Sequence, residues 1–582
     1  MTAALVILTI TIPWLGALLV WCTGDARPRL QNTLAVIFSV AAGLSALALI
    51  PNISSQTAIS ISVGSAYGNF SFVADGLGVF LAAVATVIGS LAVIFSIDYM
   101  KGEAQLGRYY ALVLFFIGAM AGLVLTSNLL LVFIFWEITA LCSYALISFH
   151  NDDPKAVAGG IKALIMTQIG GIGLLVGALL VYSYLGTFDI STFLAQSAKL
   201  PAGILALMAF GFLIAAAAKS AQFPFQTWLP DAMEAPTPIS ALIHAATMVN
   251  AGVYLLARFF PAFSPVPGWR LAVILVGMLS ALLAAVMALV ANDLKRVLAY
   301  STVSQLGFMV YAIGAGGIFA SQFHLLSHAV FKALLFLGAG AVIHSVGTRD
   351  MLLMGGLGKK MPFIRTVFVI GALALSGLPI LNGFWSKELV LESGLSGSPI
   401  WTYVVMLIVA GLTALYTFRC VWMVFYGQPR SELHAHDAGR AMRVALWPLA
   451  IGTLTTWLLA GPFSSMLSSS LPFHTIETKT TWQVLIEILS SPATYLALLV
   501  IALGLAAWWQ RRRLDGLAKG LRGIASAAAN SFGFEAINSG IVKVTQDSAE
   551  GLRVTQTGLL NWNVLAIVAT LVIVLIVLVL GV

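Results

Sequence analysis

The sequence predicts an all-α polytopic membrane protein with about 16 transmembrane helices. Of its 582 residues, 60% are hydrophobic and only 9% are charged, whereas a soluble domain carries about 25% charged residues. The mean hydropathy is +0.98, and apolar runs long enough to cross a bilayer recur along the chain. A soluble globule of this size would need far more polar surface. A soluble enzyme, a nucleic-acid-binding protein and a secreted disulfide scaffold are therefore excluded.

Each apolar run is expected to be a helix, because lipid offers no water to unpaired backbone groups. The first run has no basic segment before it, so we expect a transmembrane helix there and not a cleaved signal peptide. The candidate spans are residues 3–22, 31–50, 71–98, 109–127, 128–148, 158–185, 201–223, 236–260, 270–291, 296–316, 320–345, 363–384, 400–426, 443–468, 484–509 and 562–581.

The basic residues predict the orientation of these spans. Cytoplasmic loops carry the excess of Lys and Arg, and here that excess lies in the loops after odd-numbered spans. The even-numbered loops hold little beyond Lys199, Arg270 and Lys479. We therefore expect the odd loops in the cytoplasm and both termini on the other side. The net charge of +8 reflects these loops and is not a nucleic-acid signal.

Residues 511–561 form a long, moderately polar segment between two strong spans. The segment starts with Arg511–Arg513 and contains no proline. Leu514, Leu517, Leu521 and Ile524 recur at helical spacing, which predicts a lateral amphipathic helix on the cytoplasmic face, interrupted by glycines. The alternative is a membrane-surface helix that contacts no partner protein.

Ionisable residues inside the spans are the candidate functional residues. Each costs about 2.5–3.5 kcal/mol at mid-membrane on insertion scales, so such residues usually mark ion or proton paths. Three of them, His324, His328 and Lys332, follow one another at intervals of four residues. They therefore share one helix face, along which a proton could pass. The candidates are Glu137, Lys219, His244 and Lys387, together with the stripe His324, His328 and Lys332.

Each candidate also has a structural interpretation. His244 could simply hydrogen-bond to a neighbouring helix, and Lys387 could extend from a helix end to the membrane interface. Glu137 and Lys219 could form a buried structural ion pair. A purely structural pair could be replaced by apolar residues at little cost, which favours a functional role for these two residues.

Prolines mark two predicted breaks beside these candidates. Pro224 and Pro230 follow Lys219, Pro236 and Pro238 precede His244, and Pro379 precedes Lys387. Broken helices survive in lipid only where they are buried or line a wet cavity. Paired breaks, in helices 7/8 and 12, suggest an inverted repeat of spans 4–8 and 9–13.

Three long motifs resemble the antiporter-like subunits of respiratory complex I, Mrp-type cation/proton antiporters and membrane-bound hydrogenases. They are KSAQFPFQTWLPDAMEAPTPISALIHAATMVNAGVYLLAR, DLKRVLAYSTVSQLGFM at 293–309 and FHLLSHAVFKALLFLGAGAVIH at 323–344. FGFEAINSG and VTQTGLLNWN, near the C-terminus, are similar to the lateral helix of complex I subunit L (chain 5) and of the large Mrp A subunit.

The resemblance implies roles for single residues. Glu137 matches the fifth-helix glutamate, Lys219 the seventh-helix lysine and His244 the eighth-helix histidine. His324, His328 and Lys332 match the eleventh-helix stripe, and Lys387 matches the twelfth-helix lysine. Asp293 and Lys295 match a charged pair that opens the tenth helix, and Lys162 is a further supporting charge. The glutamate, the histidines and the lysines of the fifth, seventh, eighth, eleventh and twelfth helices are expected to serve proton or ion translocation, and Lys162, Asp293 and Lys295 are expected to be supporting charged residues.

The chain departs from the family pattern at three places. Complex I chain 5 has Arg-x-Gly-Asp in the sixth helix, where this chain has Gln168 and Gly171. Mrp A sequences often have a lysine where this chain has Asn250. The usual Gly-x-Pro-Pro of the twelfth helix reads Gly377–Ile380, with Ile in the last position.

The resemblance implies ion translocation, with the proton as the expected ion, within a complex I-type redox-driven pump such as an NADH-quinone oxidoreductase or a hydrogenase. The alternatives are an Mrp-type cation/proton antiporter subunit and, from another class, a passive channel or scaffold. The chain has no CxxC, nucleotide loop or haem-ligand pattern, so we expect a transporter subunit without a redox centre. Any iron–sulfur cluster, flavin or quinone would belong to partner subunits.

The expected partners are other membrane subunits, including further antiporter-like ones, and lipids. The expected location is the inner or cytoplasmic energy-transducing membrane. The expected parts are residues 1–108 (spans 1–3), 109–260 and 270–426 (the two antiporter-like halves), 427–510 (spans 14 and 15), 511–561 (the lateral helix) and 562–582 (a C-terminal anchor).

Overall fold

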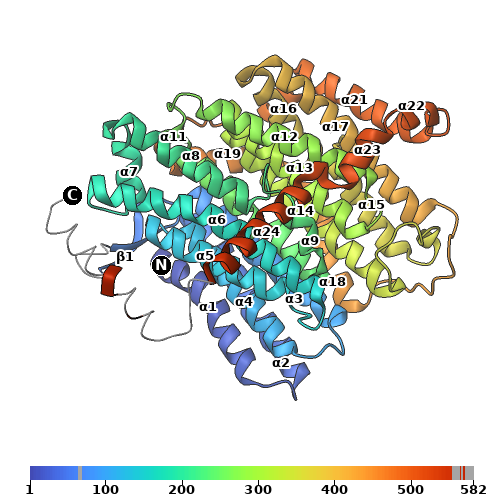
Figure 1. Ribbon diagram of the computed structural model, residues 1–582, viewed down its shortest axis with the longest axis horizontal. Helices are drawn as coiled ribbons and strands as arrows, with labels where there is room; N and C mark the ends of the chain where they lie inside the picture. The colour runs from blue at the N-terminus through green and yellow to red at the C-terminus, as the bar shows by residue number, and fades with distance from the viewer. Residues whose placement is uncertain (63–68, 554–563, 565–567, 571–582) are drawn as a thin grey trace. The chain divides into compact units, whose positions relative to one another are not determined.

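The computed structural model describes residues 1–62, 69–553, 564 and 568–570, and Figure 1 traces the chain. Contacts divide the chain into two compact units, Met1–Ala525 and Ser526–Val582. The first unit is a bundle of membrane-length helices with one short β-hairpin. The long helix of the second unit is Phe534–Arg553.

The α-helices are α1 Thr2–Cys22, α2 Pro28–Leu49, α3 Gly76–Tyr99, α4 Leu106–Leu125, α5 Leu129–Ile147, α6 Pro154–Leu185, α7 Ile190–Gln196, α8 Ala202–Lys219, α9 Trp228–Asp231, α10 Thr237–Ala241, α11 Met248–Phe263, α12 Trp269–Val290, α13 Leu294–Ala315, α14 Ile318–Val346, α15 Pro362–Ser376, α16 Asn382–Gly397, α17 Ile400–Val421, α18 Arg440–Thr455, α19 Ala460–Ser470, α20 Thr481–Ser490, α21 Pro492–Trp509, α22 Asp515–Gly520, α23 Arg522–Ala529 and α24 Phe534–Arg553; the strands are β1 Thr57–Ser62 and β2 Asn69–Val73.

Among the described residues, 14 helices are long and apolar enough to cross a membrane. They correspond to the predicted spans except the twelfth and the sixteenth. The predicted twelfth span is divided between two shorter helices, α15 and α16. The sixteenth, predicted at 562–581, lies almost entirely outside the described residues.

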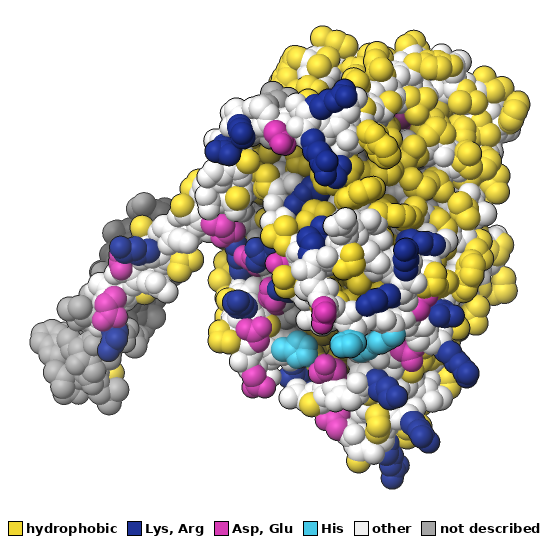
Figure 2. Space-filling model, turned by 90° about the vertical axis from the view of Figure 1, so that its right-hand side faces the viewer, with side chains coloured by type: hydrophobic (Ala, Val, Ile, Leu, Met, Phe, Trp, Pro, Cys, Tyr) yellow, Lys and Arg dark blue, Asp and Glu magenta, His cyan; other side chains and the backbone are white. Residues whose placement is uncertain are grey.

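The core of the first unit consists of the helices that carry polar residues. The most apolar 18-residue stretches of Thr237–Phe263 and of Leu294–Ala315 are wholly buried. In Pro492–Trp509, only 28% of the corresponding stretch is buried. Outer helices instead expose large apolar side chains such as Leu18 and Ile172. Figure 2 shows hydrophobic side chains covering the upper right of the face in view, while charged side chains are spread over its left and lower parts and His side chains lie in the lower part. This distribution suits a bundle surrounded by lipid.

The prediction of an all-α chain missed the hairpin. β1 and β2 pair antiparallel, with Ser60 opposite Ser71, and the register shifts between Thr57 and Ile59. Residues 71–75 were assigned to the third span, but that helix begins at Gly76, after the capping side chain of Asp75. Apolar and polar residues alternate in Asn69–Val73, a pattern typical of a strand, but the segment adjoins a long apolar run that hides it.

The predicted breaks are present at both places. α8 ends at Lys219, and short helical turns fill the distance to α11. Side chains also bind carbonyls at the ends of this break: Trp228 Nε1 donates to Ala218 O (3.0 Å), and Asn250 Nδ2 donates to Ala245 O (2.8 Å). Between α15 and α16 the chain turns at Gly377, whose φ is +79°. Each break therefore lies beside a candidate lysine.

Candidate functional site

Glu137 projects from α5 toward α6. A Cβ atom at Gly171 would overlap Oε1 of Glu137, so the missing side chain makes the space for this carboxylate. Both oxygens are buried, and the groups that face the carboxylate are the Gln168 side chain and the Lys219 ammonium. A buried charge is costly unless such groups compensate it. The position therefore suits a group that changes its proton or its partner.

Lys219 is the last residue of α8 and is fully buried. Its Nζ donates to Trp136 O at 2.7 Å and lies 4.9 Å from the centroid of the Trp136 ring. Trp136 precedes Glu137 in α5, so the ammonium and the carboxylate lie on the same part of that helix. The described residues contain no ion pair within 4.0 Å between the two. Their coupling stays a prediction.

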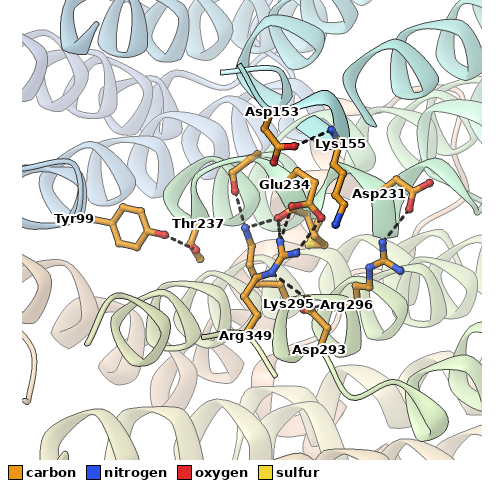
Figure 3. Close-up of polar contacts among 12 residues, drawn as sticks. Tyr99, Asp153, Lys155, Asp231, Glu234, Thr237, Asp293, Lys295, Arg296 and Arg349 are labelled. Carbon is orange, nitrogen blue, oxygen red and sulfur yellow. Dashed lines mark hydrogen bonds and ion pairs between the residues drawn. The ribbon is translucent and has the colours of Figure 1, made fainter. Parts of the chain in front are cut away.

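A charged network surrounds the first helix break (Figure 3). Asp231 binds Lys162 of α6 at 2.8 Å and Arg296 of α13 at 3.3 Å. Glu234 accepts two hydrogen bonds from Arg349, at 2.9 and 3.0 Å, and Arg349 Nε lies 3.1 Å from Asp293 Oδ2. Two of the predicted supporting residues, Lys162 and Asp293, are thus part of this network.

Arg349 joins segments that are far apart in the chain. Burial lowers the pKa of Arg349, but its hydrogen bonds to Glu234 and the charge of Asp293 outweigh this, so the pKa lies above its ordinary value. The guanidinium therefore stays charged, and it ties the break after α8 to the start of α13. We call Glu234, Asp293 and Arg349 the inner clamp.

Lys295, the third predicted supporting residue, lies next to the inner clamp, because it and Arg349 both donate to Met233 O. It is 3% exposed, and its Nζ donates to the carbonyls of Met233 and Ala235, both at 2.6 Å. These two carbonyls belong to the break itself. An ammonium from the second predicted half thus binds backbone groups that the break in the first half leaves unpaired.

His244 lies in a single π-helical turn, Leu242–Ala246, between α10 and α11. Its ring stacks on Phe336 of α14 with centroids 5.3 Å apart. Both ring nitrogens are buried and have no partner among the described residues. The alternative interpretation, a histidine that bonds a neighbouring helix, has no such bond to support it.

The α14 stripe is buried along its whole length. His324 binds Gln305 of α13 at 3.1 Å and Ser386 of α16 at 2.9 Å. His328 has no hydrogen-bond partner among the described residues, and its ring centroid is 6.4 Å from that of His324. Lys332 Nζ donates to Ser301 Oγ, and to Leu298 O at 3.2 Å. The stripe faces α13, and at His324 it reaches the second broken helix.

Lys387 lies near the start of α16 and is 1% exposed. Its Nζ donates to Leu375 O at 2.7 Å, across the second break. The lysine is therefore anchored in the interior and does not reach the interface, as the alternative interpretation required. The neighbouring Glu388 is equally buried, and its carboxylate faces Lys387 and the Thr494 side chain of α21.

Beyond α16 a cavity of about 180 Å³ opens, lined by acidic and basic side chains. Glu392, one helical turn after Glu388, lines it together with Glu477, Lys479 and Glu487. Lys479 Nζ lies 2.7 Å from Glu487 Oε2 and 3.6 Å from Glu477 Oε2. Burial lowers the pKa of Lys479, but the hydrogen bond and charge of Glu487 raise it by more. We call this cavity the charged vestibule.

Several polar residues of the site were not predicted. Glu388 could have been predicted from the sequence, because it is an ionisable residue that adjoins Lys387 in an apolar segment. Asp75 and Arg258 form a buried ion pair, in which Arg258 Nη2 donates to Asp75 Oδ1 at 2.9 Å. Both residues lie inside predicted spans. Gln305, Ser301 and Ser386 had no signal, because such residues are frequent in any helix. In the part of the chain that the structure describes, no three His, Cys, Asp or Glu side chains are arranged to hold a metal ion.

Two family models match the chain. Residues 126–413 match the model described as NADH:quinone oxidoreductase/Mrp antiporter, TM. Residues 61–110 match that of NADH-Ubiquinone oxidoreductase (complex I), chain 5 N-terminus.

Curated relatives agree with these models. The chain is 44% identical over 381 residues to NAD(P)H-quinone oxidoreductase chain 5 of Synechocystis sp., covering 63% of this chain and 56% of the relative. It is 41% identical over 423 residues to F(420)H(2) dehydrogenase subunit L of Methanosarcina mazei, covering 66% and 63%. The chain thus spans somewhat over half the length of these relatives.

Solved structures share the fold. A chain of the Mrp complex from Dietzia sp. DQ12-45-1b is 29% identical with a TM-score of 0.85, covering 99% of this chain and 63% of that one. A chain of the membrane-bound sulfane sulfur reductase, an archaeal respiratory membrane complex, has a TM-score of 0.71 at 24% identity, covering 84% of this chain and 99% of that one.

The molecule is thus a polytopic helical membrane protein in which two broken helices place ionisable side chains inside the bundle. The relatives whose motifs it shares are membrane subunits of multisubunit complexes. The chain belongs to the family of antiporter-like membrane subunits of complex I-type oxidoreductases and Mrp antiporters.

Proposed function

We propose that this chain translocates protons as the antiporter-like subunit of a redox-driven complex I-type pump. One observation carries the proposal. Buried ionisable side chains extend from the Glu137–Lys219 region at the first break, through His244 and the α14 stripe, to Lys387 at the second break. Burying so many ionisable groups is costly, which suits a path for charge better than a packing role.

The path has an entrance and an exit in this proposal. At the inner clamp, Lys295 contacts the break that leads to His244. At the other end, Glu388 is one turn from Glu392, which lines the charged vestibule. His328, with no partner among the described residues, lies between the bound groups His324 and Lys332. Mobile water next to it would connect the two groups.

In this proposal the supporting charges hold the path and do not carry the ion. Lys162 and Asp293 keep the broken segment attached to α6 and α13. The two predicted halves, 109–260 and 270–426, would each contribute one broken helix. Redox cofactors would lie in partner subunits, and the complex would sit in an energy-transducing membrane with the odd-numbered loops in the cytoplasm.

The second candidate function is that of an Mrp-type cation/proton antiporter subunit. The observation that favours it is the likeness to the Mrp complex chain over 99% of this chain, at a TM-score of 0.85. The third is a passive channel or scaffold. Subunits that copurify with the chain separate the first two: quinone-oxidoreductase or hydrogenase subunits support the redox pump, and small Mrp subunits support the antiporter.

Transport assays separate the first two functions from the third. We expect Glu137→Gln and Lys219→Met each to abolish coupled proton uptake into vesicles that carry the assembled complex. The control is Lys199→Met, which removes an exposed lysine from the end of a short surface helix. If either core variant moves protons at the parental rate, the Glu137–Lys219 region is structural and the proposed path is wrong.

A further inference from the structure

A basic, tryptophan-lined cavity lies where α17 and α21 end, away from the proposed path. Its volume is about 560 Å³, and it is lined by Trp422, Trp508, Trp509, Gln510 and Arg511–Arg513. α17 and α21 pack against each other, and both belong to membrane-length helices. The cavity therefore lies at the level where a bilayer meets water.

A tight turn brings three successive arginines to this one cavity. Arg511 N bonds to Trp508 O, Arg513 N bonds to Gln510 O at 2.8 Å, and Leu514 N bonds to Arg511 O at 3.2 Å. In a continuing α-helix, consecutive side chains would point in different directions. Because the helix ends here, all three guanidinium-bearing residues line the same space.

Arg511 is held in place by aromatic rings. Its guanidinium carbon lies 4.6 Å from the Trp508 ring centroid and 5.5 Å from that of Trp422. Its Nη1 also donates to Trp508 O at 3.2 Å. A guanidinium fixed between aromatic faces loses little freedom when it binds an anion.

The three positive charges have no counter-ion in the part of the chain that the structure describes. Within it, none of Arg511, Arg512 and Arg513 forms an ion pair within 4.0 Å. The lining residues include no Asp or Glu. The cavity thus favours an anion, and the planar arginine fork suits a phosphate group in particular.

The surroundings favour a lipid as the source of that phosphate. Tryptophans at the ends of spans lie at headgroup depth. Leu496, Leu499 and Leu503 of α21 are 44–58% exposed and follow one face of the helix toward the cavity. An acyl chain can lie along this face while its headgroup occupies the basic cavity. We propose that the cavity binds the headgroup of an anionic phospholipid.

Native mass spectrometry of the delipidated complex containing the full chain tests this proposal. The probes are phosphatidylglycerol, phosphatidylcholine and inorganic phosphate. We expect the triple variant R511Q/R512Q/R513Q to bind phosphatidylglycerol about tenfold more weakly or worse, because each basic residue near a membrane contributes attraction. The matched control R27Q/R29Q/K101Q also loses three exposed positive charges, and it should retain the lipid within about twofold.

Three results would overturn the proposal. Equal retention of phosphatidylcholine would indicate a merely apolar site. Displacement of the lipid by millimolar inorganic phosphate would indicate a site for a soluble anion. Equal losses in the triple variant and its control would indicate general attraction to the membrane.

A second measurement needs no variant, so it does not depend on correct folding of the altered chain. Photoreactive phosphatidylglycerol added to the parental complex should crosslink to the peptide that contains residues 508–513. Absence of that crosslink, while other peptides react, would show that something else fills the cavity and that the proposal is wrong.

Discussion

Gly171 has no side chain, and the Glu137 carboxylate occupies the space where one would be. We therefore predict that Gly171→Ala displaces this carboxylate while α5 and α6 stay in place, because the overlapping atom is the far end of a flexible side chain. A displacement of about 1 Å of a reacting group is enough to cost large factors in rate. Coupled proton uptake should fall by about tenfold or more.

Gly203→Ala is the matched control for this substitution. Gly203 lies in the neighbouring α8, and a Cβ there would meet nothing within 4 Å. Assembly on native gels should be normal for both variants, and proton uptake should stay at the parental rate in the control. Parental uptake in Gly171→Ala would show that the position of the Glu137 carboxylate does not matter.

The second prediction at the residue scale concerns the α14 stripe. Lys332→Met should nearly stop translocation, whereas His324→Ala or His328→Ala should only slow it. Water can bridge a missing imidazole if the gap is polar and roomy, but it cannot replace the charge of Lys332. The two bonds from Lys332, to Ser301 and Leu298, show that α13 fixes this ammonium.

Lys332→Arg separates charge from titration at the same position. Arginine stays protonated, so this variant should assemble and yet fail to relay protons. The measurement is proton uptake into vesicles, driven by the native energy source. Full activity would show that a fixed charge suffices at this position, and the relay role would be wrong.

At the scale of elements, the inner clamp joins the broken segment after α8 to α13. Arg349 is 33% exposed and faces Glu234, which is 14% exposed. Arg349→Met would leave Glu234 and Asp293 without this counter-charge. A buried group that loses its partner costs about 1–3 kcal/mol, so we predict thermal denaturation of the detergent-solubilised protein a few degrees lower.

The control for the clamp is Arg553→Met. Its ion pair with Glu550 is exposed on both sides, at 78% and 70%, and such pairs contribute about 0–1 kcal/mol. A differential scanning fluorimetry trace should therefore hardly change. Equal shifts in the two variants would mean that the clamp does not stabilise the break.

The elements that sequence reasoning found are those with a strong local cause. The prolines at 224–238 and at 379 disfavour a continuous helix, and both breaks are present. The hairpin was missed because its two strands are short and border an apolar span. The inner clamp was only partly visible: Asp293 was predicted as a supporting charge, but its partner Arg349 is 56 positions away in the chain.

For the whole molecule, sequence predicted which residues are buried and charged but not what they contact. Lys219 was expected beside Glu137, yet its ammonium bonds to a carbonyl and stacks on Trp136. The bonds of His324 to Gln305 and Ser386 join three helices. No local pattern encodes contacts of this kind, because they depend on how the bundle packs. Almost all of the predicted C-terminal anchor, and residues 554–561 of the predicted lateral helix, lie outside the described residues.

The last prediction concerns assembly of the whole complex and rests on the second unit. In α24, Ile537, Ile541 and Val544 share one face at helical spacing, while Lys543, Asp547 and Glu550 share a different, polar face. Phe532 and Gly533, both with positive φ, separate α24 from α23, in agreement with an interrupted helix. An apolar face in so polar a segment needs a hydrophobic partner, either lipid or protein.

We predict that the partner is protein, so that deletion of residues 520–550 releases adjacent membrane subunits on native gels. A matched variant keeps the helix and removes only its apolar face, as I537S/I541S/V544S. This variant should release the same subunits, whereas K543S/D547S/E550S, which alters the polar face, should not. If the deletion leaves both assembly and pumping unchanged, the segment is a membrane-surface helix without a protein partner, since lipid alone then covers its apolar face.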